Sequence, residues 1–322
     1  MVLTTSNRAA ERRHLLAQSR SGLDCFRLTA RFDTNDGNTQ SSCPVVAATR
    51  GESHPTRTGE RLGRTVIVMG RVAMKSSVPR EKVRQYSDEG FFVLEAVIPH
   101  EHLELLRTVC AAAVDEMNAD MDRQGCDVLG INHRGKRYFC GQTMRRHPEL
   151  REFLFSDLAA DICRATLGPD VYLHNDQYVV KCGREGMAFG WHQDGAYVHH
   201  RIGDHPECVT LWCALDDVNE ENGTIYVLPT HRCGGRQLVE HVKDERSNDR
   251  IGYFGDDPGV PVIAPAGSIA VFSSVTFHRS GPNPGGSVRR AYLAQYAPVQ
   301  LLNEPGVFPQ YYGELFLQDG RS

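Results

Sequence analysis

The chain has 322 residues, of which 40% are hydrophobic and 24% charged, and its formal net charge is −4. This composition is typical of a soluble globular protein with one large core or two modest ones, and the negative charge argues against a nucleic-acid partner. No apolar run approaches the roughly eighteen residues that a membrane span requires, so we expect no membrane partner.

The first 74 residues differ in charge from the rest of the chain. Residues 1–74 contain eleven arginines, no lysine and six acidic residues, whereas the remainder carries 25 basic and 34 acidic residues. The segment is weakly periodic and rich in small polar residues, which is typical of disorder. A transit peptide would also be arginine-rich, but acidic residues interrupt this segment and it shows no sustained amphipathic helix. We therefore predict a disordered extension, or a start assigned in error ahead of Met69 or Met74, followed by one folded domain over residues 75–322.

Beyond residue 80 the predicted helices come before the predicted strands. His102–Asp122 places apolar residues at helical spacing along one side, and Glu149–Leu167 predicts one or two helices closed by Gly168 and Pro169. Seven short strands are predicted to follow, at Val171–Val180, Phe189–Asp194, Val209–Leu215, Thr224–Pro229, Pro261–Ile263, Ser268–Phe272 and Val288–Ala297. This order predicts an all-β core with flanking helices, arranged as a double-stranded β-helix of the cupin-like jelly-roll type.

The second predicted strand carries the most informative motif, a histidine and a carboxylate two residues apart. Successive strand side chains point to opposite faces, so His192 and Asp194 project together while Gln193 points away. An imidazole nitrogen beside a carboxylate oxygen suits a first-row metal ion such as Fe(II), provided that a second histidine arrives from elsewhere. We interpret His199 and His200, which follow the motif, as part of a loop at the mouth of a pocket.

A second histidine lies 86 residues downstream, where the apolar run Ser268–Phe272 leads to His278. The chain then turns at a Ser-Gly pair and resumes as the strand Val288–Ala297, so we expect a hairpin-like return with His278 at its mouth. Arg289 follows His278 by eleven residues, and an arginine fork is suited to binding a carboxylate through two parallel hydrogen bonds. Histidine, aspartate, a distant histidine and then an arginine form an ordered set that rarely arises by chance.

Five segments match the pattern of one family. They are Tyr86–Leu94, Trp191–Asp194, Leu211–Asp217 together with Glu221–His231, Gly267–Ser280, and the arginine at position 289. Together they resemble the phytanoyl-CoA dioxygenase family, a branch of the Fe(II)- and 2-oxoglutarate-dependent oxygenases, over roughly residues 80–300. Two departures, Thr230 where the family has glycine and Ser268 where it has aspartate, touch no predicted metal ligand.

The resemblance implies a site in which His192, Asp194 and His278 occupy one face of an octahedral Fe(II). 2-Oxoglutarate and O2 would take the remaining positions, and Arg289 would bind the distal carboxylate of 2-oxoglutarate. Thr210 and Ser280 stand where hydroxyl groups of the family bond the carboxylates of 2-oxoglutarate, although each could equally be a plain strand hydroxyl. Ascorbate is a candidate reductant. Related halogenases replace the metal-binding acid by a small residue, so the acid retained here favours hydroxylation.

Several alternatives stay open at this point. A catalytically silent cupin-like binding module would lack a ligand or the arginine, and neither is missing. A hydrolase or isomerase of the same fold that uses Zn(II) or Mn(II) would need no arginine to anchor an oxoacid, so the position of Arg289 argues against this alternative. Desaturation and epoxidation are alternative outcomes of the oxygenase chemistry.

No phosphate-binding glycine loop or basic cluster favours a coenzyme A ester, so we expect a small secondary metabolite or a lipid-like molecule as substrate. We expect the protein to be a monomer or a small homo-oligomer.

Ten cysteines are scattered along the chain without any Cys-x-x-Cys pair. No secretory signal accompanies them, and their spacing does not predict a zinc site. We therefore interpret them as reduced thiols, several of them buried as small apolar side chains, in a cytoplasmic protein.

Overall fold

The computed structural model describes residues 78–302 and 312–322, all within one compact unit, Gly70–Ser322. The extension predicted over residues 1–74 lies outside the described residues.

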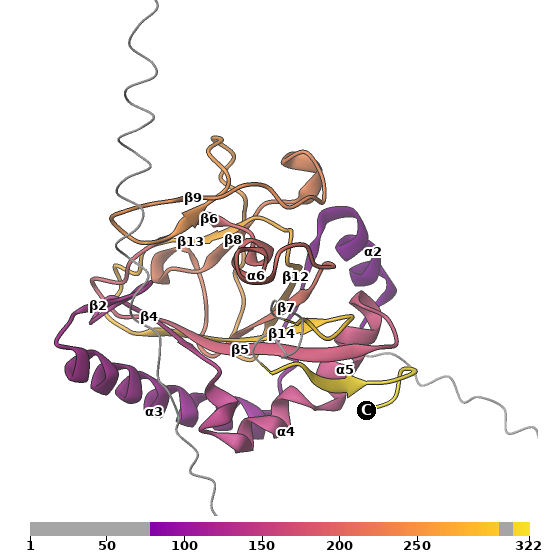
Figure 1. The fold of residues 1–322 in the computed structure, drawn as a ribbon, viewed down its shortest axis with the longest axis horizontal. Coiled ribbons are helices and arrows are strands. Elements are labelled where there is room, and N and C mark those ends of the chain that lie inside the picture. The colour runs from indigo at the N-terminus through magenta and orange to yellow at the C-terminus, as the bar shows by residue number, and fades with distance from the viewer. Residues whose placement is uncertain (1–77, 303–311) are drawn as a thin grey trace, which may run out of the picture. The chain divides into compact units, whose positions relative to one another are not determined.

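Two antiparallel sheets pack against each other across a shared core (Figure 1). The larger sheet contains nine strands, β1 (Phe91–Leu94), β2 (Val128–Leu129), β3 (Asn132–His133), β4 (Arg137–Gly141), β5 (Val171–Lys181), β7 (Val209–Ala214), β12 (Ile269–Ser273), β14 (Arg289–Ala297) and β15 (Glu314–Leu317). Their order is β1-β12-β7-β14-β5-β4-β3-β2, with β15 paired to β5. The smaller sheet contains β6 (Phe189–His192), β8 (Ile225–Val227), β11 (Val260–Pro261) and β13 (His278–Ser280), in the order β11-β8-β13-β6. A separate hairpin joins β9 (Val242–Lys243) and β10 (Arg250–Ile251).

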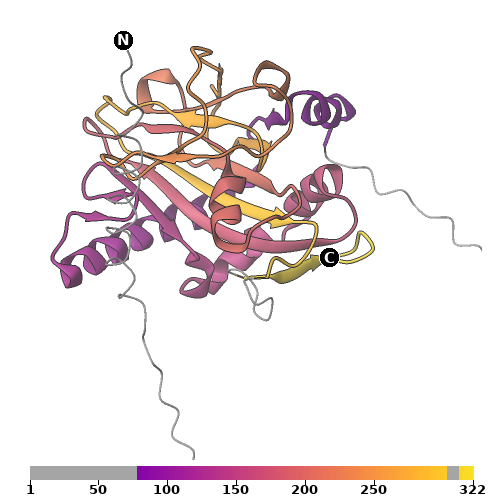
Figure 2. The same ribbon diagram turned by 45° about the horizontal axis from the view of Figure 1, so that its top comes forward.

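Helices cover the face of the larger sheet that points away from the smaller one, where α3, α4 and α5 lie in Figures 1 and 2. The described helices are α2 (Arg80–Glu89), α3 (His100–Gln124), α4 (Arg151–Leu154), α5 (Asp157–Thr166) and α6 (Asp194–Ile202), with short 3-10 turns at η1 (Thr143–Arg145), η2 (Pro148–Leu150), η3 (Glu220–Asn222) and η4 (Thr230–Arg232). Helix α2 ends at Gly90, whose φ of 84° is left-handed. A Cβ at this position would collide with the hydroxyl of Thr276, so glycine alone lets the helix turn directly into β1.

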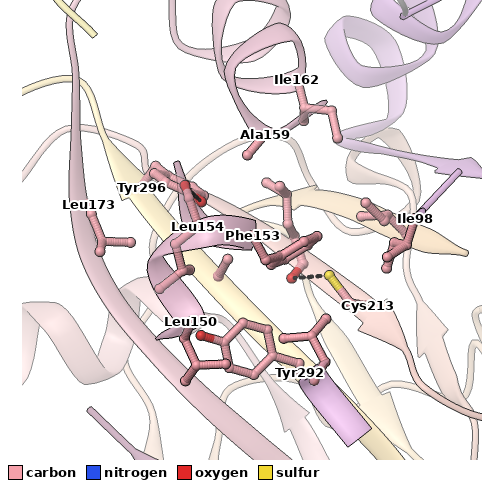
Figure 3. Close-up of a cluster of buried hydrophobic side chains, with 14 of the residues drawn as sticks. Ile98, Leu150, Phe153, Leu154, Ala159, Ile162, Leu173, Cys213, Tyr292 and Tyr296 are labelled. Atoms are coloured by element: carbon pink, nitrogen blue, oxygen red, sulfur yellow. Dashed lines mark hydrogen bonds between the residues drawn. The ribbon is translucent and has the colours of Figure 1, made fainter. Parts of the chain in front are cut away.

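Alternate residues of β14 supply two layers of the core. Tyr292 and Tyr296 pack beneath the helices, where the Tyr292 ring meets Phe153 edge-on at 6.0 Å (Figure 3). Ala291 and Leu293 face the smaller sheet instead, in the core between the two sheets. The all-β core with flanking helices that the sequence predicts is therefore confirmed, because β14 separates a helix-covered layer from a sheet-covered layer.

An irregularity in the pairing of β5 with β14 brings polar side chains into the space between the sheets. Gln295 pairs with Asn175, but the next residue of β14, Tyr296, pairs with Leu173, so β5 has one extra residue at this point. Such a bulge reverses which face the following residues occupy. As a result, Asn175 and Gln177 line a cavity between the sheets, whereas Leu173 packs in the core beneath the helices.

The predicted hairpin-like return toward His278 is wrong. Strand β12 pairs with β1 and β7, and the chain leaves the larger sheet after Ser273. His278 begins β13 in the smaller sheet, while β14 returns to the larger sheet between β5 and β7. The crossing is made by a buried turn in which Ser274 Oγ accepts from the Cys208 amide at 2.9 Å and the Ser273 carbonyl accepts from the Thr276 amide at 2.9 Å. Because the whole segment is buried, its sequence cannot show where the chain changes sheets.

Two further elements differ from the prediction. Strand β6 ends at His192, and Asp194 begins α6, which contains His199 and His200 where a loop was predicted.

Within the described residues, no helix combines the length and the apolar character that crossing a bilayer would take.

Candidate functional site

Three elements bring the predicted ligands together. His192 ends β6, Asp194 begins α6, and His278 begins β13. His192 and His278 are directly paired across β6 and β13, and their ring centroids lie 4.1 Å apart. Gln193 has an extended backbone, with φ −115° and ψ 131°, so the strand alternation continues for two residues past the end of β6. For this reason Asp194 reaches the same side as His192 although it belongs to a helix.

The three side chains converge on one point. Their candidate ligand atoms all lie within 4.8 Å of one another. Oδ1 of Asp194 is 3.7 Å from Nε2 of His192 and 3.5 Å from Nε2 of His278. Two imidazole nitrogens and one carboxylate oxygen at this spacing are able to hold a single metal ion, leaving the opposite side of that ion open.

Backbone carbonyls fix the two imidazole rings. Nδ1 of His192 lies 2.9 Å from the Gly190 carbonyl, and Nδ1 of His278 lies 3.2 Å from the Thr276 carbonyl. A carbonyl oxygen can only accept, so each Nδ1 donates and each Nε2 keeps its lone pair for a metal. Burial, together with the neighbouring His278, holds the pKa of His192 well below its usual range, so this ring is neutral and able to bind a metal.

The second oxygen of Asp194 is held by two side chains. Thr210 Oγ1 donates to Oδ2 at 2.6 Å, and Gln295 Nε2 donates to the same oxygen at 3.0 Å. These contacts leave Oδ1 directed at the histidines. The hydroxyl of Thr210 therefore lies behind the carboxylate, and its predicted contact with 2-oxoglutarate stays a prediction.

Arg289 points into the space between the sheets and is 1% exposed. Its Nη2 donates to the Gly223 carbonyl at 2.7 Å and its Nη1 to the Val179 carbonyl at 3.3 Å, while the ring of Trp212 lies 5.6 Å from the guanidinium carbon. Burial lowers the pKa of Arg289 to about 10, which still leaves it charged at neutral pH. Among the described residues no carboxylate forms an ion pair with it, and its Nε has no hydrogen-bond partner. A buried guanidinium with a spare donor is suited to binding an anion.

Ser280 lies two residues beyond His278 on β13 and is buried. Strand alternation puts both side chains on the same face of the smaller sheet. The contact between the Ser280 hydroxyl and a carboxylate of 2-oxoglutarate stays a prediction.

Lys181 was not singled out from the sequence. It pairs directly with Arg289 across β5 and β14, and its Nζ donates to the carbonyls of Met187 at 2.5 Å and Gly281 at 2.6 Å. Burial, with Arg289 as the second cause, holds its pKa well below the usual range. The predicted strand ended at Val180, one residue before Lys181, which is the last residue of β5.

A cavity opens beside the three converging side chains. Its lining includes the amides of Asn175 and Gln177, the rings of Phe139 and Phe189, and the guanidinium of Arg201. The cavity also reaches His192 and Asp194, so a molecule bound in it would lie next to a metal held by them.

Comparisons with known proteins identify a family and a shared fold. The family model for phytanoyl-CoA dioxygenase matches residues 86–291, more than half of the chain. An ectoine dioxygenase of Bordetella parapertussis is 25% identical over 236 residues, which cover 67% of this chain and 74% of that protein. An L-proline trans-4-hydroxylase of Streptomyces griseoviridis is 31% identical over 154 residues, which cover 41% of this chain and 57% of that protein. The structure of EctD from S. alaskensis with 2-oxoglutarate and 5-hydroxyectoine shares the fold, with a TM-score of 0.53, 19% identity, and coverage of 76% of this chain and 85% of that one.

Proposed function

Because the chain belongs to the phytanoyl-CoA dioxygenase family of 2-oxoglutarate-dependent dioxygenases, we propose that it hydroxylates an unactivated C–H bond of a small polar molecule. His192, Asp194 and His278 would hold Fe(II), with 2-oxoglutarate and O2 as cosubstrates and ascorbate as a reductant. The convergence of these three side chains on one point is the observation that carries the proposal.

The residues present fit this metal. Two neutral imidazoles and one carboxylate, each fixed from behind by a hydrogen bond, form the donor set that non-haem Fe(II) takes in oxygenases. When bound there, Fe(II) with 2-oxoglutarate and O2 supplies the oxidising power for attack on a C–H bond, and CO2 and succinate are released. The protein contributes the fixed ligands, which are buried, and a cavity beside them that is lined in part by the rings of Phe139 and Phe189.

Arg289 would bind the distal carboxylate of 2-oxoglutarate. Its guanidinium is buried, charged and not ion-paired within the described part of the chain, and its Nε is a donor without a partner. A carboxylate at this position would satisfy that donor and neutralise the charge.

The amides beside the site support a substrate that carries an N–H or O–H group. Asp194 only accepts hydrogen bonds, so the group of Gln295 facing it is the NH2, and the Gln295 carbonyl then accepts from Asn175 Nδ2 at 3.0 Å. This chain of contacts leaves Oδ1 of Asn175 as a buried acceptor without a partner among the described residues. A lipid chain would leave this acceptor unsatisfied, whereas an amine, amide or hydroxyl of the substrate would donate to it. The names of two relatives, for ectoine and for proline, also point to small polar substrates.

We place the enzyme in the cytoplasm. All eight cysteines among the described residues are free thiols, as expected in a reducing compartment. Burial raises the pKa of Cys110 and of Cys140 to about 12, so these two thiols are unreactive side chains of the core.

The proposal is tested by following succinate release from the purified full chain across a panel of small amines, amino acids and polar metabolites. We expect release that depends on the substrate and requires Fe(II), 2-oxoglutarate and O2 together. The variant His278→Ala, which removes one ligand, should abolish it. Turnover that proceeds without 2-oxoglutarate, or that survives His278→Ala, would contradict the proposal.

A further inference from the structure

Gln193 stands between two of the proposed metal ligands but points away from them. Its neighbours His192 and Asp194 face the site, and strand alternation turns the Gln193 side chain to the opposite side. There it is 0% exposed. A fully buried carboxamide has to be paired by hydrogen bonds, so its partners show what this side chain holds.

The carboxamide of Gln193 makes three hydrogen bonds, all to backbone groups. Its Nε2 donates to the Val275 carbonyl at 2.6 Å and to the Gln237 carbonyl at 2.8 Å, and its Oε1 accepts from the Val239 amide at 3.0 Å. Both hydrogens of the NH2 group are thereby used. The backbone amide of Gln193 donates in addition to Nε2 of His241 at 3.0 Å.

These contacts join three separate segments of the chain. The first contains His192 and Asp194, the second contains Gln237, Val239 and His241, and the third contains Val275, three residues before His278. A further hydrogen bond of 2.8 Å, from the Gly195 amide to the Ser274 carbonyl, ties the first segment to the third. The spacing between the two histidine-bearing segments is therefore fixed by these contacts in addition to the pairing of β6 with β13.

We propose that Gln193 is a positioning residue, which fixes the segment of His192 and Asp194 against the segment of His278 and so sets the affinity of the site for its metal. The inference rests on the proposed metal site. It also implies that metal binding stabilises the segment at Gln237–His241, which supplies no ligand.

Glutamine is required here because of its size and its donors. Glutamate has the same length but would replace the NH2 group by an acceptor oxygen, which would face the carbonyls of Val275 and Gln237. Methionine fills a similar volume but leaves both carbonyls and the Val239 amide without a partner. Asparagine is one methylene shorter and cannot span all three groups.

Asn283 provides a matched control. It is also 0% exposed, and its carboxamide makes three hydrogen bonds to backbone groups, donating to Ser287 at 2.8 Å and Lys181 at 3.3 Å and accepting from Gly285 at 3.1 Å. Those bonds hold the turn between β13 and β14 together and against the end of β5, and none of them reaches the segments of His192, Asp194 and His278.

The experiment titrates the metal-free full chain with Co(II), which reports its coordination by visible absorption, and records thermal unfolding without metal. We expect Gln193→Met and Gln193→Glu to weaken Co(II) binding by about tenfold or more and to change its spectrum, as loss of outer contacts to metal ligands does. Asn283→Leu should lower the unfolding temperature similarly but leave the Co(II) affinity and spectrum as in the wild type. Equal Co(II) affinity in the wild type and a Gln193 variant would overturn the proposal, as would an equal loss in Asn283→Leu.

Hydrogen exchange on the wild-type chain keeps the inference testable if the Gln193 variants do not fold. Co(II) should slow exchange of the Val239 amide, which bonds to Gln193, more than that of the Gly285 amide, which bonds to Asn283. Equal effects on the two amides would overturn the positioning role alone. A wild-type chain that binds no Co(II) would instead overturn the metal site and this inference with it.

Discussion

Two neighbouring arginines on β14 have opposite surroundings. Arg289 faces the space between the sheets without an ion-pair partner among the described residues, whereas Arg290 faces the other way and binds Asp216, with Nε 3.0 Å from Oδ2. Adjacent strand residues point to opposite faces, so one of the two enters the interior and the other does not. Arg290 thus serves as the control for Arg289.

We predict that Arg289→Ala raises the 2-oxoglutarate concentration needed for half-maximal turnover by roughly thirtyfold or more. Losing a charge-assisted contact in a dry pocket costs on the order of 2–4 kcal/mol of binding free energy, at about 1.4 kcal/mol per tenfold. Arg290→Ala should leave the requirement nearly unchanged. Titrating 2-oxoglutarate against both variants checks this, and the reverse pattern would show that Arg289 does not bind the cosubstrate.

Thr210→Val removes the hydroxyl that donates to Asp194 while keeping the size of the side chain. We predict about a tenfold to hundredfold loss of metal affinity, because contacts that orient a metal ligand contribute on this scale. Measuring metal and 2-oxoglutarate affinity separately distinguishes the two roles of Thr210. If metal binding stays intact and only 2-oxoglutarate binding weakens, the hydroxyl contacts the cosubstrate as the sequence resemblance implies.

At the scale of residues, strand alternation predicts that His192 and Asp194 face the same side, and it holds even though Asp194 belongs to a helix. Alternation also predicts that only one of Arg289 and Arg290 enters the interior, and the family resemblance selects Arg289. The roles of Gln193 and Gln295 are not visible in the sequence. An amide side chain has no spacing rule, because its role depends on which backbone groups and carboxylates the fold brings within 3 Å of it.

At the scale of elements, a buried ion pair holds the segment before β10 against the larger sheet. Arg137 on β4 binds Asp249, and Asp249 also accepts from the Gly190 amide at 3.0 Å, within β6, the strand that ends at His192. The Arg137 guanidinium lies 4.9 Å from the centre of the Phe189 ring, which itself packs edge-on against His192. This pair therefore supports one wall of the site.

We predict that Asp249→Ala lowers the free energy of unfolding by about 3–5 kcal/mol, because it leaves the buried guanidinium of Arg137 without its carboxylate. Asp257→Ala is the control, since its ion pair with Arg232 is partly exposed and solvent screens it, so we expect a much smaller loss. Denaturant unfolding of the two variants tests the difference. Similar losses in both would mean that burial of the pair is not what stabilises this segment.

The long periodic elements could be predicted from the sequence, whereas several two-residue strands could not. The predicted helix His102–Asp122 corresponds to α3, and the predicted strand Val171–Val180 to β5. Strands β2, β3, β9 and β10 have two residues each, too few for any periodicity to show. Strand β13 was missed for a different reason, since Ser274 and Thr276 in the turn before it are buried and their burial cannot be read from the sequence.

At the scale of the whole molecule, the described core contains a residue as early as Val78, and α2 begins at Arg80. We predict that a chain starting at Met74 folds and turns over like the full chain, because the described core and the family match both begin beyond residue 74. Unfolding temperature and succinate release of the two chains provide the comparison. An insoluble or inactive shortened chain beside an active full one would show that the extension belongs to the fold.

The pairing of His192 with His278 has a consequence for the lifetime of the folded state. The two residues are 86 positions apart, so a chain in which β6 and β13 have not met offers a metal only the neighbouring His192 and Asp194. The complete site forms late, after the entropy of closing this long loop has been lost. A bound ion should therefore slow unfolding much more than it speeds refolding. With a metal at the proposed site, its release would accompany separation of the two strands, and a bound ion would lengthen the time that each molecule stays folded.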